Sequence, residues 1–235
     1  MVPAAKKMDA DERRASILSA AIPLFAAKGL EGVKTREIAE AAGVSEALLY
    51  RHFPSKDALF AEVQCTCLAG NAEDVERLGR LPDTTSTLVL AVYLVVRRVS
   101  GGPSVSEAQR ATKQLLLRSL LETGNFARGF LKQASAPWVD KLTRCWHGAR
   151  AAGDLVPDAP EPDVGVWLAH HLAFGLSSFY LVTPPVQPLP VAGEALQDAT
   201  TRFALRGIGV RHEAIAAHFN PEAFRLLAAG APGQN

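Results

Sequence analysis

Residues 35–59 decide the fold and read TREIAEAAGVSEALLYRHFPSKDAL. Ile38 and Ala42 lie four residues apart and therefore share one helical face. Gly43 can adopt the left-handed backbone that ends a helix, and Ser45 then offers a hydroxyl that can cap the next helix. Two short helices joined by a turn of three or four residues that contains glycine are typical of a helix-turn-helix.

Further residues in the same stretch meet the demands of this arrangement. Thr35 can cap the first helix with its hydroxyl, and Glu37 suits the positive end of the helix dipole. Ala39 is small where a second helix must cross closely, and Leu49 is placed to face the preceding helix. The stretch therefore predicts two short helices that cross at a sharp corner.

The continuation LLYRHFPSKDALF resembles the segment that closes the DNA-binding domain of TetR-family regulators. The matching residues are Tyr50, Phe53, Ser55 and Lys56. The resemblance covers residues 11–60, and Leu48 departs from the pattern because many members carry a small hydroxyl residue there. Tyr50 and Phe53 could both be core aromatics, but the resemblance implies that Tyr50 contacts DNA, and we expect only Phe53 in the core.

The resemblance implies an all-α protein of two parts. Residues 1–58 are expected to form the helix-turn-helix DNA-binding domain, and residues 59–235 a helical domain for ligand binding and dimerisation. The predicted DNA-binding residues are Thr35, Arg36, Ser45, Glu46, Ala47, Leu48, Tyr50, Arg51, His52 and Lys56.

Within this set we expect some residues to read bases and others to contact phosphates. Recognition helices read base edges mainly with their N-terminal residues, which favours Glu46 and Ala47 for sequence choice. Glu46 could accept a hydrogen bond from a cytosine amino group, or it could simply repel phosphate. Tyr50, His52 and Lys56 are expected to hold phosphates.

Net charge alone does not support DNA binding, because DNA-binding domains are expected to be basic. The chain has a formal net charge of +1. Residues 1–60 contain nine Lys and Arg against eight Asp and Glu, which is again +1. The placement of the bases gives more support, since five basic side chains cluster around the two short helices. These are Lys34, Arg36, Arg51, His52 and Lys56. The helix N-termini at Thr35, Ser45 and Ser55 add backbone N–H donors for phosphates.

Several classes of protein are disfavoured by what the sequence lacks. No uncharged apolar run reaches the ~18–20 residues of a membrane span, and the N-terminal MVPAAKKMDADERR has no apolar core, so we expect no signal peptide. Three cysteines, an odd number, favour a reducing cytoplasm over a disulfide framework. A phosphate-binding glycine loop, zinc spacing, a nucleophile elbow and paired carboxylates are all missing. We therefore expect neither an enzyme nor a cofactor or metal site.

The rest of the chain predicts helices joined by loops. Residues 1–10 are expected to be a disordered arm, and residues 183–190, with four prolines, a loop. Residues 86–99 are rich enough in β-branched residues to resemble a strand, but their length favours a buried helix. The expected helices cover residues 11–28, 55–78, 86–99, 104–121, 126–152, 163–182, 194–206, 211–218 and 221–229.

Two stripes in the C-terminal part combine large apolar residues with isolated polar ones, as in many small-molecule pockets, although such stripes are more often core. The predicted ligand-binding residues are Arg118, Trp138, Leu142, Cys145, Trp146, Trp167, His171 and Phe174. Arg118 forms a strip with Arg110 and Gln114 that could meet an acidic group or face solvent. The resemblance implies a pocket here without choosing its residues, and we expect an apolar or aromatic effector.

The function that the resemblance implies is a homodimeric transcriptional regulator. Small residues in 163–182 make that helix, with 194–206, the candidate dimer interface. Two recognition helices could then meet successive major grooves about 34–36 Å apart on a near-palindromic operator in double-stranded DNA.

We expect a repressor, released when a small molecule shifts the helix after the motif and with it the spacing of the two recognition helices. Such an effector must bind the two states differently. One alternative is a DNA-binding activator or architectural protein without ligand control. Another is a helical carrier or enzyme whose helix-turn-helix is structural.

Overall fold

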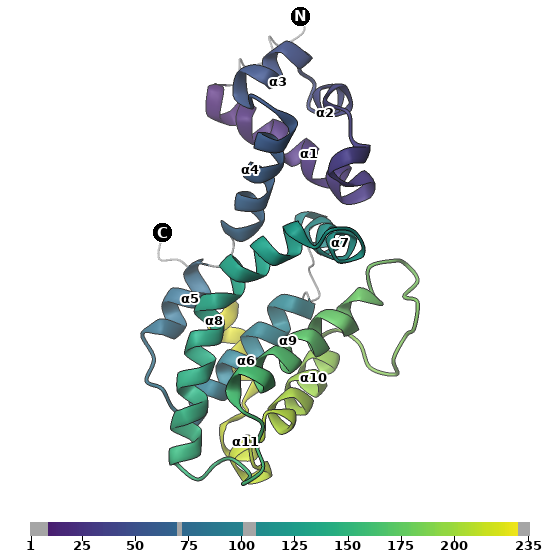
Figure 1. Ribbon diagram of the computed structural model, residues 1–235. Coiled ribbons are helices and arrows are strands. Elements are labelled where there is room, and N and C mark those ends of the chain that lie inside the picture. The colour runs from purple at the N-terminus through teal and green to yellow at the C-terminus, as the bar shows by residue number, and fades with distance from the viewer. Residues whose placement is uncertain (1–8, 70–71, 101–106, 230–235) are drawn as a thin grey trace, which may run out of the picture. The chain divides into compact units, whose positions relative to one another are not determined.

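The computed structural model describes residues 9–69, 72–100 and 107–229 (Figure 1). Within these ranges the secondary structure is helical, apart from one isolated antiparallel bridge between Leu155 and Val210. The predicted all-α class is therefore confirmed. Residues 1–8 of the expected N-terminal arm lie outside the described residues.

The chain divides into two compact units, residues 1–70 with 106–131, and residues 71–105 with 132–235. The first contains α1 (Ala10–Gly32), α2 (Thr35–Ala41), α3 (Glu46–His52), α4 (Lys56–Ala69), α7 (Glu107–Leu121) and the beginning of α8 (Asn125–Ala151). The second contains α5 (Ala72–Gly79), α6 (Thr85–Ser100), the rest of α8, α9 (Pro162–Ser178), α10 (Gly193–Gly207), α11 (His212–His218) and α12 (Pro221–Ala229). The functional boundary after residue 58 remains a separate prediction, because compactness groups residues by packing and not by role.

Helix α1 is the scaffold of the first unit. It begins with a capping box, in which the Glu12 N–H donates to Asp9 Oδ1 (2.7 Å) and the Asp9 N–H donates to Glu12 Oε2 (3.0 Å). Its buried side chains include Ile17, Ala21 and Phe25. Helix α1 packs against α4 and α7. The predicted helix 11–28 is followed by a kink at Gly29, where φ is 73°, and α1 extends beyond it to Gly32.

One predicted helix bound is wrong, and another prediction lies partly outside the described residues. Within the predicted helix 55–78 the structure describes α4 and α5, and residues 70 and 71, which would join them, lie outside the described residues. The helix predicted to end at 182 ends at Ser178 instead. There the Tyr180 and Leu181 N–H groups bond three residues back, a tighter pattern that commonly closes a helix.

Helix α6 is the centre of the second unit. It packs against α9, α10, α11 and α12, and Leu88, Val92 and Val96 are buried on it. The prediction that residues 86–99 form a buried helix is therefore confirmed. The β-branched residues serve packing here, since burial among neighbouring helices outweighs their intrinsic preference for strands.

An ion pair between the buried Lys141 and the exposed Asp83 holds the segment before α6 against α8. Lys141 is almost fully buried, and its Nζ donates to Asp83 Oδ1 (2.6 Å) and to the carbonyl oxygen of Leu81 (2.5 Å). Arg144 Nε donates to Asp83 Oδ2 (3.2 Å). One turn further along α8, a Cβ on Gly148 would lie 2.0 Å from the backbone oxygen of Asp83. The segment therefore approaches α8 too closely for any side chain at position 148.

This close approach predicts that Gly148→Ala destabilises the protein. The new methyl group must displace the Asp83 segment, and we expect a loss of about 1–3 kcal/mol in the free energy of unfolding. The control is Gly129→Ala on the same helix, where a Cβ would meet nothing within 4 Å. Because alanine is the better helix former, the control should be neutral or stabilising by up to about 1 kcal/mol. If urea unfolding gave equal losses in the free energy of unfolding for the two variants, this account would be contradicted.

The ion pair also predicts a dependence of stability on pH. The hydrogen bond from Lys141, helped by the charges of Lys141 and Arg144, holds the pKa of Asp83 below its ordinary value of 3.8. The unfolded chain therefore binds this proton more readily than the folded chain. The stabilisation is complete above pH 3.8 and is lost as the pH falls through the lower folded-state pKa.

Asp83→Asn should therefore be less stable than the wild type near pH 6, with a difference that shrinks below about pH 4. The exposed Asp158 provides the control variant Asp158→Asn, which should follow the wild type throughout. Thermal unfolding midpoints across this range would measure the effect. A stability difference between Asp83→Asn and wild type that does not change with pH would rule out this linkage.

Candidate functional site

The turn between α2 and α3 has the geometry that its glycine predicts. Gly43 has a φ of 65°, in the left-handed region. Its N–H donates to the carbonyl of Glu40 (3.1 Å), and the Val44 N–H donates to the carbonyl of Ala39 (2.9 Å). This pair of bonds is the Schellman closure of a helix, which needs a left-handed residue at the position of Gly43. The turn therefore ends α2 and redirects the chain into α3.

Helix α3 begins and packs as predicted. The Leu48 N–H donates to Ser45 Oγ (3.1 Å), so Ser45 is the N-cap. Leu49 and Phe53 are buried, which confirms Phe53 as a core residue. The guanidinium of Arg14 lies 4.5 Å from the centre of the Phe53 ring. These contacts hold one side of α3 and leave its other side accessible.

The predicted capping role of Thr35 is wrong. The N-cap of α2 is Lys34, whose N–H donates to Glu37 Oε2 (3.0 Å). Thr35 is the first residue inside the helix, and its Oγ1 donates to Glu46 Oε1 (2.5 Å) on α3. The same Oγ1 lies 3.3 Å from the hydroxyl oxygen of Tyr50. Thr35 therefore connects the two helices instead of capping one of them.

All ten predicted DNA-binding residues are at least partly accessible. The exposed ones are Arg36, Ser45, Glu46, Ala47, Tyr50 and Arg51, and the half-buried ones are Thr35, Leu48, His52 and Lys56. Tyr50 is unusual among the aromatics of the first unit because 45% of it is exposed. Contact with DNA remains a prediction for each of them.

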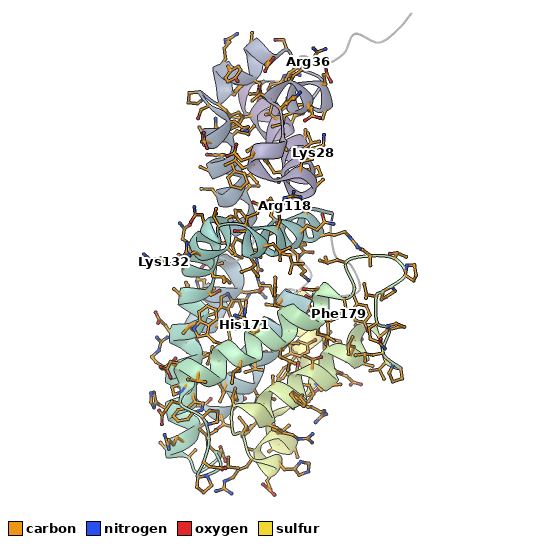
Figure 2. The ribbon with its side chains drawn as sticks, turned by 45° about the vertical axis from the view of Figure 1, so that its right-hand side comes forward. Lys28, Arg36, Arg118, Lys132, His171 and Phe179 are labelled. Atoms are coloured by element: carbon orange, nitrogen blue, oxygen red, sulfur yellow. The ribbon has the colours of Figure 1, made fainter. Side chains whose placement is uncertain are left out.

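Ion pairs balance the acidic groups of α2. Arg36 Nε donates to Glu40 Oε1 (2.9 Å), and both side chains are largely exposed (Figure 2). The hydrogen bond to Glu40 is the main reason why the pKa of Arg36 lies above its ordinary value. Lys28 Nζ donates to Glu37 Oε1 (2.5 Å), which lowers the pKa of Glu37. The small net charge of this part of the chain therefore counts two acidic side chains, Glu37 and Glu40, that already form ion pairs with Lys28 and Arg36.

Four of the predicted ligand-binding residues lie in the core of the second unit, and they are Trp138, Leu142, Cys145 and Trp146. The indole N–H of Trp146 donates to the carbonyl of Ile208 (3.2 Å). Burial raises the pKa of the Cys145 thiol to about 11. Leu142 also lines a wholly apolar cavity of about 10 Å³, together with residues of α6 and α9. Because one water needs about that volume, the cavity in this form is too small for an organic ligand.

Helix α9 carries the other predicted aromatic residues. Trp167 and Phe174 are half-buried. His171, which is labelled in Figure 2, is exposed. Between them lies His170, whose ring is parallel to that of Phe174 at 6.4 Å between centres. His170 Nδ1 is buried without a hydrogen-bond partner among the described residues. Burial, helped by His171, lowers the pKa of His170 to about 4, so this imidazole is neutral near pH 7.

Arg118 belongs to the first compact unit, whereas the other seven predicted ligand-binding residues belong to the second. Its Nη1 donates to the carbonyl of Ala27 (2.6 Å), and its Nε donates to Glu122 Oε1 (3.0 Å). A Cβ on Gly29 would lie 2.7 Å from Arg118 Nε. The guanidinium is therefore engaged at the end of α1, and an effector contact would have to compete with these bonds.

Among the ionisable groups that were not singled out from the sequence, two are half-buried and have a strongly lowered pKa. One is His170, where the neighbouring His171 was chosen instead. The other is Lys113 on α7, whose pKa burial lowers to about 8 with help from the charge of Arg110. The hydrophobic pattern of the sequence gives little indication that either group is shielded from solvent, because the burial of one imidazole or one ammonium depends on neighbours far away in sequence.

An apolar surface extends over α9 and its connection to α10. Residues 164–193 contain no Asp, Glu, Lys or Arg. Val164, Leu168 and Phe179 are exposed at positions that share one face of α9, and Phe203 is exposed on α10. The connecting loop adds further exposed apolar side chains, namely Val182, Val186, Leu189 and Val191. Helices α9 and α10 pack against each other, so these side chains belong to one region of the second unit.

Among the helices of the described ranges, none combines the length and the apolar character needed to cross a membrane. The same ranges contain no group of three or more His, Cys, Asp or Glu side chains that could hold a metal ion.

Comparison with known proteins agrees with this geometry. The family model described as "Bacterial regulatory proteins, tetR family" matches residues 17–63, which include α2, α3 and most of α1. The solved structure of AibR in complex with isovaleryl coenzyme A and operator DNA covers 85% of this chain and 100% of its own, with a TM-score of 0.59. At 18% identity, this likeness shows the fold alone.

Two curated relatives extend the match along the chain. The uncharacterized HTH-type transcriptional regulator YuxN of Bacillus subtilis is 28% identical over 134 residues, 57% of this chain and 39% of that protein. The matched part thus spans less than half the length of that relative. The HTH-type transcriptional repressor KstR of Rhodococcus jostii is 34% identical over 173 residues, 69% of this chain and 73% of that protein. The extent of this second match, with the family model on the helix-turn-helix, shows that the chain belongs to the TetR family of bacterial regulatory proteins.

Proposed function

We propose that this protein is a homodimeric transcriptional regulator of the cytoplasm that represses by occupying a near-palindromic DNA operator. The observation that carries the proposal is the packing of α3, which is buried on one side and accessible on the other. Ser45 caps it, Leu49 and Phe53 bury one side, and Glu46 and Tyr50 remain exposed on the other. A helix held in this way can enter a major groove without disturbing the core beneath it.

Control by a small molecule is the second part of the proposal. Its support is the naming of KstR as a repressor and the solved AibR complex that contains both isovaleryl coenzyme A and operator DNA. In this chain the aromatic side chains of α9, Trp167 and Phe174 with the neutral His170, suit an apolar or aromatic effector. Binding would require a conformation with a larger pocket than the cavity beside Leu142.

The proposed mechanism is a change in the spacing of the two recognition helices. An effector that favours the form with the larger pocket shifts the population toward it, and it can do so only by its difference in affinity for the two forms. Because each half-site has a fixed position on DNA, a shift of spacing weakens both contacts together. A DNA-binding activator or architectural protein without ligand control would bind the same operator but would not be released.

Selection of bound sequences from random duplex DNA by the purified protein tests the proposed function. A dimer should enrich an inverted repeat whose affinity falls steeply with salt, since the phosphate contacts displace counterions. A helical carrier or enzyme with a structural helix-turn-helix would enrich no sequence, even at low salt. That result would end the proposal.

Tyr50 provides a sharper test of the assigned surface. Tyr50→Phe removes only the hydroxyl that we expect to donate to a phosphate, and operator affinity should fall about tenfold or more, as for a lost hydrogen bond to a charged group. Tyr93→Phe is the matched control, because Tyr93 is a buried core residue of the second unit and lies outside both proposed interfaces. Fluorescence anisotropy on the selected operator gives both affinities. Unchanged binding by Tyr50→Phe would show that this face of α3 does not contact phosphate.

The apolar region formed by α9, its connection to α10 and Phe203 is the proposed dimer interface, because an apolar surface of this kind suits a second copy of the same surface. Leu168→Asp places a carboxylate on it, where Leu168 is 60% exposed in the single chain. We expect this variant to sediment as a monomer and to lose operator binding. Leu226→Asp on α12, at a leucine that is 74% exposed, should remain a dimer. Analytical ultracentrifugation measures the oligomeric state of both variants, and a dimeric Leu168→Asp would place the interface elsewhere.

A further inference from the structure

The recognition helix carries a carboxylate on its accessible side. Glu46 is the first residue of α3 and is exposed. The helix dipole favours a negative charge at this end, which explains why the residue is tolerated in the free protein. A carboxylate repels phosphate, however, so Glu46 cannot serve the backbone contacts expected of its neighbours. Its position suits a contact with a base edge instead.

The structure also holds this carboxylate in place. Thr35 Oγ1 donates its only proton to Glu46 Oε1 at 2.5 Å. In the free protein the contact of 3.3 Å between Thr35 Oγ1 and the Tyr50 hydroxyl therefore has Tyr50 as its donor, and Tyr50 must give up this contact to donate its single proton to a phosphate. One oxygen of Glu46 is thus fixed from α2, and in the described part of the chain no donor bonds to the other oxygen, Oε2. An oriented acceptor with a vacant lone pair remains at the start of α3.

The chemistry of the major groove decides which base can use this acceptor. An ionised carboxylate only accepts hydrogen bonds. Guanine presents two acceptors in the groove, and thymine presents an acceptor beside a methyl group. Adenine presents an amino donor, but its N7 acceptor lies directly beside it and would face the second carboxylate oxygen. Cytosine presents the amino group without an adjacent acceptor on the same base.

We propose that Glu46 selects a cytosine in each half-site of the operator and that Thr35 is the positioning residue for this contact. The inference rests on the proposed DNA-binding function and adds a base preference to it. It also assigns a role to the hydrogen bond from Thr35 to Glu46, which holds the base-reading carboxylate in place.

The test compares the sequences selected by the wild type and by Glu46→Gln. Glutamine keeps the shape of the side chain but offers a donor and an acceptor, which match the N7 and the amino group of adenine. We expect one symmetric pair of positions to change from cytosine to adenine while the rest of the inverted repeat is unchanged. Affinities for duplexes with each base at that position should show a cytosine preference of about tenfold in the wild type, and an adenine preference in the variant.

Four further variants separate base reading by Glu46 from a role of Glu46 in folding. Thr35→Val removes the donor at nearly constant shape and should reduce the cytosine preference severalfold, whereas Thr35→Ser should retain it. Tyr50→Phe should weaken binding to all four duplexes alike, because a phosphate contact carries no base information. Glu31→Gln, at an exposed carboxylate of α1, should keep both the affinity and the preference of the wild type.

The outcomes are distinguishable. If the wild type enriches no sequence, the proposed function falls and the base preference falls with it. If the wild type enriches an inverted repeat but Glu46→Gln selects the same bases, the regulator stands and the role of Glu46 is overturned. The role is also overturned if Glu46→Gln binds no duplex while Thr35→Val keeps the full cytosine preference, since Glu46 would then serve folding.

Discussion

The left-handed turn at Gly43 is the constraint on which the helix-turn-helix depends. Its bonds to the carbonyls of Ala39 and Glu40 close α2 within seven residues, so α3 starts at a set angle. A side chain at Gly43 would find open space around it. The restriction therefore comes from the backbone angle alone, because φ values near 65° are unfavourable for residues with a Cβ. The contact between Thr35 and Glu46 follows from this angle, since it joins the first residues of the two helices.

The basic side chains of the first unit have two structural roles. Arg14 and Arg118 donate to backbone carbonyls of His52 and Ala27 and so hold the ends of α3 and α1. Lys28 and Arg36 instead pair with the acids of α2. A net charge near zero is compatible with a DNA-binding surface under these conditions, because local placement and not the sum decides the field that a phosphate meets.

The second unit contains buried polar atoms that form hydrogen bonds and others that have no partner among the described residues. Lys141 and Trp146 direct their polar atoms to carbonyl or carboxylate oxygens. The neutral His170 on α9 has no such partner at its Nδ1 within the described chain. A buried polar atom without a partner costs free energy, and this cost is the reason why His170 belongs to the proposed effector site. Family resemblance indicated a sensing region without choosing residues, and burial is what separates His170 from His171.

The sequence by itself determined the all-α class, the two short helices with their glycine turn, and the accessible residues of α3, because caps, turns and helical periodicity are local properties. Only the tertiary structure decided the roles of several residues named in advance. Thr35 links α2 to α3 instead of capping, Trp138 and Trp146 are core, and Arg118 closes α1. Each of these outcomes depends on partners from 11 to 91 positions away. Local spacing shows which face of a helix is apolar, but it carries no information on which distant segment will cover that face.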